Sequence, residues 1–168
     1  MHLLIALDSS PLNERITGFL KHFFDQLKEV PILSFIHVID SRIIGAAADV
    51  PGVTMNYDVL SMSLEDEDVL VRQLRKDASE IIEDVQRELG VDGTIDFPLD
   101  DPVSALAEAC RQKKPDFLIM GTHSRKGINH FLFGNFAEKV LRRVNVPLIV
   151  IPEKSLIKDF ETVKFEVK

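Results

Sequence analysis

Short apolar runs alternate with longer segments of helical period along this chain, and this alternation limits the fold more than any other feature. Five runs rich in aliphatic and aromatic residues are expected to be strands: residues 3–7, 32–39, 94–99, 117–120 and 147–151. Continuous apolar runs suit strands that are buried on both faces, as in a parallel sheet. The intervening segments are long enough for right-handed crossover helices. The pattern predicts an α/β fold, an open, doubly wound, five-stranded parallel sheet with helices on both faces.

Four segments between and after these runs carry apolar residues at spacings of three and four, which is the period of an amphipathic helix. They cover residues 12–27, 64–89, 102–114 and 136–144. Pro11 suits the first turn of one helix and Pro102 opens another, because proline is favoured where a helix begins. Ser63 and Asp66 form a variant capping box, and Gly90 suits the end of that helix. The single cysteine, Cys110, is most simply a buried apolar thiol.

Two segments do not follow the alternation. Residues 40–63 contain glycine and proline among small and polar residues, and this predicts a long loop of the kind that often forms lids or binding segments. Near the end of the chain, Val163, Phe165 and Val167 alternate with charged residues and predict an extra strand exposed on one face. We therefore expect one domain over residues 1–152 and an extension over 153–168, which is an edge strand or crosses to a partner subunit.

Charge and hydropathy exclude several classes of partner. The 20 basic and 27 acidic residues give a formal net charge of −7, the opposite of what a nucleic-acid-binding protein normally carries. No apolar run approaches the about 20 residues of a membrane-spanning helix. The first residues show neither a basic region nor a cleavage site. We expect a cytoplasmic protein that binds neither nucleic acid nor membrane.

Candidate binding residues gather after the first and fourth predicted strands. In doubly wound sheets, ligands bind beyond the carboxyl ends of the strands. Asp8 follows the first strand, and the loop of residues 121–127 (GTHSRKG) follows the fourth with two glycines, two hydroxyls and two cations. Gly134 and Asn135 precede the last helix, whose free N–H groups suit an anion. Helix caps and turns use the same residues, so the pattern alone leaves a phosphate site and a purely structural role both open.

No motif of metal binding or of catalysis accompanies these residues. The five histidines show no close pair of the HxxxH kind, so no metal ligand is predicted. His37 lies inside a predicted buried strand and is expected to be a packed, hydrogen-bonded core residue. The chain lacks a GxSxG elbow, and residues 6–14 differ from the HxGH and SGGxDS-like loops that follow the first strand in nucleotidyl-transfer enzymes. We predict no catalytic residue and no enzymatic activity.

Residues 120–152, MGTHSRKGINHFLFGNFAEKVLRRVNVPLIVIP, resemble the signature that ends the universal stress protein (UspA) domain. That signature is a glycine, two residues, a glycine, nine residues, and a glycine followed by serine or threonine. The resemblance includes ALDSS, IHVID and DPVSALAEAC, and it spans residues 2–152. It implies a cytoplasmic stress-response protein, usually a homodimer, with strands in the order 3-2-1-4-5. Some members of the family bind ATP and others do not.

The resemblance also implies which residues would bind ATP. In ATP-binding members, the residue matching Asp8 contacts the nucleotide and the residue matching Val38 lies near the adenine. Gly121, His123 and Gly134 match residues that surround the ribose and the phosphates. The candidate set is completed by neighbours of these positions: Met120, Ser124, Arg125, Gly127 and Asn135. A divalent metal ion is expected only together with the nucleotide.

The chain departs from the family pattern at the phosphate end. Ser124 stands in place of the second glycine, where its Cβ restricts φ, and Asn135 stands in place of the final hydroxyl residue. Asp100 replaces a glycine often found before Asp-Pro, and with Asp101 it would repel a triphosphate lying nearby. Arg125, Lys126 or a metal ion could offset that field. The alternative to an ATP-binding protein is therefore a dimeric interaction or regulatory protein, with a vestigial pocket and an unknown protein partner.

Overall fold

A five-stranded parallel sheet forms the centre of the computed structural model, which describes residues 1–42, 64–122 and 135–153. Its strands are β1 (His2–Ala6), β2 (Ile32–Ile36), β4 (Thr94–Asp96), β6 (Phe117–Thr122) and β7 (Leu148–Pro152). They lie side by side in the order β4-β2-β1-β6-β7, and all four neighbouring pairs are parallel. In the numbering of the five expected strands this is the order 3-2-1-4-5, so the predicted fold class is confirmed.

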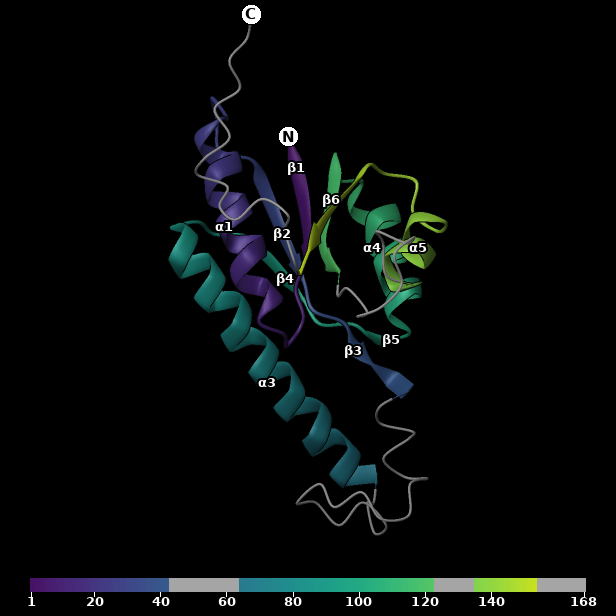
Figure 1. Cartoon of the computed structure of the whole chain (residues 1–168). Coiled ribbons are helices and arrows are strands. Elements are labelled where there is room, and N and C mark those ends of the chain that lie inside the picture. Colours follow the sequence, from purple (N-terminus) through teal and green to yellow (C-terminus); the bar gives the residue numbers. More distant parts are fainter. Residues whose placement is uncertain (43–63, 123–134, 154–168) are drawn as a thin grey trace, which may run out of the picture.

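Helices cover both faces of the sheet, with α1 (Leu12–Asp25) and α3 (Leu64–Leu89) on one side and α4 (Pro102–Lys113) and α5 (Asn135–Leu141) on the other (Figure 1). Successive residues of a strand point to opposite faces of the sheet, so side chains of β1 pack against the helices on both faces. Leu3 and Ile5 pack into one core cluster, and Leu4 packs into the other. All three have no exposed surface. This double burial explains why β1 is a continuous apolar run.

Two of the expected strands are shorter than predicted. The runs at residues 32–39 and 94–99 are each interrupted, and their ends form a separate two-stranded parallel sheet of β3 (Ile39–Asp40) and β5 (Leu99–Asp100). Pro98 lies at the break and has no N–H to continue a ladder. Its carbonyl oxygen instead accepts a hydrogen bond from the Ile39 N–H at 2.9 Å. This small sheet extends beyond the carboxyl edge of the main one.

The helix ends follow local backbone chemistry. Gly90 has φ +65° directly after α3, in agreement with the predicted glycine end. Asp101 caps α4, because its side chain accepts a hydrogen bond from the Ser104 N–H. Pro11 is the N-cap of α1 and precedes its first turn, which corrects the position predicted for it by one residue. The Ser63 cap, most of the 40–63 loop and the extension from residue 154 lie outside the described residues.

Within the part of the chain that the structure describes, no helix has both the length and the apolar character needed to cross a bilayer.

Candidate functional site

A cavity of about 450 Å³ lies at the carboxyl ends of the strands, where the sequence places the site. Ligand pockets commonly measure about 300–1,000 Å³, so a small molecule fits. Its apolar lining includes Leu12, Ile16, Ile36, Val38, Leu106 and Met120. Its polar lining includes Asp8, Asp40, Arg42, Thr122 and Asn135. The apolar surface suits a flat ring, and the polar groups suit a sugar or a charged substituent.

Five of the ten predicted site residues line this one cavity. They are Asp8, Val38, Met120, Gly121 and Asn135, which come from four separate elements or their ends. The other five are His123, Ser124, Arg125, Gly127 and Gly134, and they lie outside the described residues. The structure thus brings together every predicted residue that it describes, while the part of these residues in binding stays a prediction.

Asp8 is held in a turn between β1 and α1. Its carboxylate Oδ1 accepts hydrogen bonds from the Ser10 N–H at 2.9 Å and from the Ser10 hydroxyl at 2.5 Å. The Asn13 side-chain amide donates to the Asp8 carbonyl oxygen at 2.5 Å. An aspartate that bonds the backbone two residues further on makes a compact turn, and this is what residues 8–13 encode. The turn fixes an exposed carboxylate at the cavity.

Gly121 is needed for close packing between β6 and α1. A Cβ atom placed on Gly121 would lie 2.6 Å from Leu12 Cγ, well inside normal van der Waals contact. Leu12 itself is 3% exposed, in the first turn of α1. The family resemblance implied only that this glycine lies near the ribose and the phosphates. The structure adds a packing reason, since the missing side chain lets α1 lie directly against the strand.

Asp40 and Arg42 were not among the predicted site residues. Arg42 Nε donates to Asp40 Oδ1 at 2.8 Å, and Arg42 Nη2 donates to Asp40 Oδ2 at 2.6 Å. Arg42 Nη1 also lies 3.7 Å from Asp101 Oδ2, at the start of α4. The hydrogen bonds from Arg42 hold the pKa of Asp40 below its ordinary value. A carboxylate and a basic residue two positions later, after the second strand, were the signal in the sequence.

The structure tests the predictions made for two titratable side chains, His37 and Cys110, and the results differ. His37 is half-buried, and among the described residues its Nδ1 has no hydrogen-bond partner, so the predicted hydrogen bond is not found at this nitrogen. Burial lowers the pKa of His37, and the nearby Asp8 partly opposes this shift. Cys110 is 1% exposed, and burial raises its pKa to about 11, as expected of a packed thiol.

No group of three or more metal-ligating side chains is present in residues 1–42, 64–122 and 135–153.

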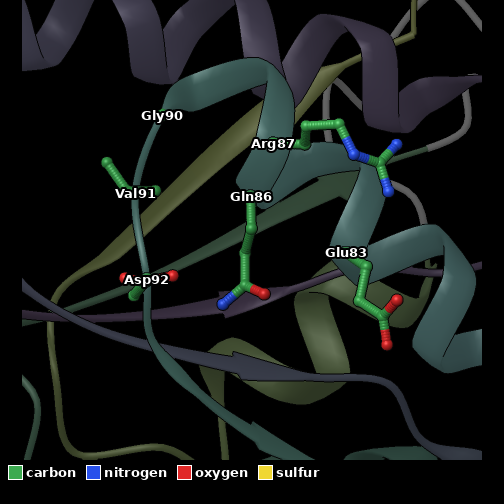
Figure 2. Close-up of a pocket in the computed structure, with 6 residues that line it drawn as sticks. All are labelled: Glu83, Gln86, Arg87, Gly90, Val91 and Asp92. Atoms are coloured by element: carbon green, nitrogen blue, oxygen red, sulfur yellow. The ribbon is translucent and has the colours of Figure 1, made fainter.

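A second hollow lies at the turn from α3 to β4, at the opposite edge of the sheet (Figure 2). The side chains of Glu83, Gln86 and Arg87 point in different directions there and do not converge on one point. Two of them have protein partners: Arg87 pairs with Asp84 at 2.5 Å, and the Gln86 amide donates to the Gly93 carbonyl oxygen at 3.2 Å. This hollow offers a ligand few unengaged groups, and the cavity at the carboxyl edge is the better candidate site.

Comparisons with known proteins agree with this architecture. The family model described as "Universal stress protein family" matches residues 1–152. Universal stress protein MJ0577 of Methanocaldococcus jannaschii is 27% identical over 145 residues, which cover 81% of this chain and 86% of that protein. The solved structure of MJ0577 has a TM-score of 0.69 at 22% identity and covers 92% of this chain and 96% of that one.

Two further structures of similar fold contain nucleotides. A universal stress protein from Archaeoglobus fulgidus in complex with dAMP has a TM-score of 0.54 at 16% identity, over 90% of this chain and 97% of that one. A universal stress protein in complex with cAMP has a TM-score of 0.53 at 16% identity, over 92% and 98% of the two chains. At these identities the likeness establishes the fold. Because the family model covers nearly the whole sequence, the chain belongs to the universal stress protein family.

Proposed function

We propose that this universal stress protein binds an adenine nucleotide in the cavity at the carboxyl edge of the sheet and acts in the stress response in the cytoplasm. The observation that carries this proposal is the convergence of Asp8, Val38, Met120 and Gly121 on one cavity of about 450 Å³. The resemblance of the glycine loop predicts ATP as the ligand. The dAMP and cAMP complexes of two other family members support a nucleotide in general.

The lining of the cavity suits the two chemically distinct parts of a nucleoside. Val38, Leu106 and Met120 present apolar surface, against which a purine ring loses contact with water. Asp8 presents a carboxylate that can accept hydrogen bonds from ribose hydroxyls. A charged hydrogen bond of this kind contributes about 1.5–3 kcal/mol, which corresponds to roughly tenfold or more in affinity.

Binding without turnover is part of the proposal. The Ser10 hydroxyl donates a hydrogen bond to the Asp8 carboxylate within the turn that precedes α1. This bond gives the serine and the aspartate a structural role in the turn, so their proximity is no sign of a catalytic pair. Burial makes Cys110 a poor nucleophile. The groups that most resemble a nucleophile in the described chain therefore have structural explanations.

The alternative function is that of a dimeric interaction protein whose cavity is vestigial. The observation that favours it is the position of β7, which is the last strand in the order of the sheet and pairs with β6 on one side. An edge strand presents backbone groups that can pair with a second chain. A homodimer that pairs along β7 is compatible with both functions. A measurement of nucleotide binding therefore distinguishes the nucleotide-binding protein from the interaction protein.

The test of the proposal is calorimetric titration of the full chain with adenosine, AMP and ATP, together with mass spectrometry of small molecules released from freshly purified protein. Asp8→Ala is expected to weaken all three ligands by about tenfold or more. Asp92→Ala is the control, because Asp92 belongs to the hollow at the opposite edge. Wild-type protein that binds none of the ligands at millimolar concentration would refute the proposal and leave the interaction protein.

A further inference from the structure

Arg42 neutralises a partly buried carboxylate at one end of the cavity. The Asp40 side chain is 20% exposed, whereas that of Arg42 is 67% exposed. Both oxygens of Asp40 accept from the guanidinium, and Oδ1 also accepts from the Arg42 backbone N–H at 3.0 Å. Two parallel N–H···O bonds are the strong arrangement of an arginine–carboxylate pair. The pair therefore occupies the carboxylate edge that would otherwise offer two acceptors to a ligand.

The small β3–β5 sheet concentrates negative charge at this end. Its parallel register sets Asp40 opposite Asp100, and Asp101 follows at the start of α4. Three carboxylates thus gather around the guanidinium of Arg42, which lies within 4 Å of two of them. The net charge of this group is negative, and it repels any anionic part of a ligand.

The other end of the cavity has a different character. Gly121, Thr122 and Asn135 line it and are uncharged. This end belongs to β6 and α5, whereas Asp40 belongs to β3, in the separate two-stranded sheet with β5. On the proposed function, a nucleotide therefore has its phosphates toward β6 and its base toward Asp40 and Arg42.

Adenine and guanine differ in what they offer to a carboxylate. The Watson–Crick edge of guanine carries two adjacent donors, N1–H and the N2 amino group, which match the two oxygens of a free carboxylate. Adenine has the N6 amino donor next to the N1 acceptor, so it bonds one oxygen and sets its lone pair against the other. A free Asp40 would favour guanine, and an Asp40 already held by Arg42 would not.

We propose that Arg42 is a specificity-determining residue of this cavity, which holds Asp40 in a bidentate ion pair and thereby denies guanine nucleotides the carboxylate that would favour them over adenine nucleotides. The inference rests on the proposed function. Arg42 acts through Asp40 and need not touch the ligand.

The test is to titrate AMP and GMP into three proteins. They are the wild type, the single variant Arg42→Met, and the double variant that combines Arg42→Met with Asp40→Asn. Methionine keeps the length of the side chain and removes its charge and donors. The wild type is expected to prefer AMP. Arg42→Met should shift the GMP-to-AMP affinity ratio toward GMP by about tenfold, which one additional charged hydrogen bond supplies. Asp40→Asn in the same chain should return the ratio to near the wild-type value, because an amide offers guanine only one acceptor.

Arg87→Met is the matched control, since Arg87 forms an exposed ion pair with Asp84 on α3 at the opposite edge. It should leave the ratio unchanged, and equal melting temperatures of the variants would show that all of them fold. If AMP binds and Arg42→Met leaves the ratio where Arg87→Met leaves it, the role of Arg42 is overturned and the proposed function stands. If neither nucleotide binds to the wild type, both are overturned.

Discussion

Replacing Gly121 by alanine tests the packing of the cavity wall. The added Cβ would lie 2.6 Å from Leu12 Cγ and 3.5 Å from Ile16 Cδ1. Both of these side chains are almost fully buried, so Leu12 must leave its rotamer or α1 must move. Overpacking of this kind costs about 1–3 kcal/mol. No positive φ is involved at Gly121, so alanine also restricts the unfolded chain and regains about 0.4–1 kcal/mol.

The net loss expected for Gly121→Ala is therefore about 1–2 kcal/mol in the free energy of unfolding. For a domain of this size, each kcal/mol lowers the melting temperature by about 2–4 °C. Urea unfolding measures the loss, and an unchanged m-value shows that the change lies in stability. Gly18→Ala is the control: Gly18 lies in the middle of α1, its Cβ would meet nothing within 4 Å, and alanine there should stabilise by about 0.5–1 kcal/mol.

A double-mutant cycle with Leu12→Ala identifies the cause. Leu12→Ala alone should cost about 2–5 kcal/mol, because it empties a buried site. If Leu12 is the side chain that the new Cβ strikes, Gly121→Ala becomes nearly harmless in that background, and the two changes together cost less than their sum by about 1 kcal/mol or more. Additive losses, or a loss below about 0.5 kcal/mol for Gly121→Ala, would refute the reasoning.

Further predictions concern the phosphate end of the site, Cys110 and the oligomeric state. Ser124→Gly with Asn135→Ser should tighten ATP more than adenosine in calorimetric titration, because both changes restore the family pattern at the phosphate end, and equal gains would contradict this explanation. The thiol of Cys110 should react far more slowly with a disulfide reagent at pH 8 in the folded protein than in urea. Since burial raises its pKa from 9.0 to about 11, stability should be unaffected below pH 9 and should fall as the pH rises toward 11. Sedimentation at micromolar concentration should show a dimer that pairs along β7, and a chain without residues 155–168 measures the share of the extension; a monomeric full chain would end this prediction.

The central strands follow from features that are local in the sequence, whereas their order does not. Leu3, Leu4 and Ile5 form an unbroken apolar run, and the structure buries all three completely on alternate faces. The resemblance of the glycine loop supplied the strand order, which periodicity alone does not give. Asp8 was predictable for a similar reason, since a polar turn after a buried strand in a parallel sheet lies at the edge where ligands bind.

The features that were missed depend on contacts between distant residues. Arg42 meets Asp101 because β3 pairs with β5, and this pairing joins segments about sixty residues apart. The sequence showed Asp40 only as the start of an aperiodic segment. In the same way, no local pattern shows that the side chain missing from Gly121 leaves room for Leu12. The hydrogen bond expected for His37 was inferred from burial, and burial does not specify a partner.

Gly93 offers a comparison with Gly121, because it is needed for packing of the fold but lies outside the cavity. A Cβ on Gly93 would lie 2.8 Å from the Leu33 carbonyl oxygen, which is held in the sheet and cannot turn aside as a side chain can. Gly93 precedes β4 at the amino end of the sheet and does not line the cavity. Gly93→Ala should therefore destabilise the protein by about 1–3 kcal/mol and leave the affinity of the folded protein for AMP unchanged.

Gly121→Ala should lower both stability and affinity, because Leu12 is part of the cavity wall and the new methyl group pushes it toward the ligand. Titrations below the melting temperature of each variant compare the two glycines directly. Equal losses of AMP affinity for Gly93→Ala and Gly121→Ala would show that the affinity depends on the overall stability of the protein and not on the cavity wall. A loss confined to Gly121→Ala would instead place the ligand against the surface where α1 meets β6.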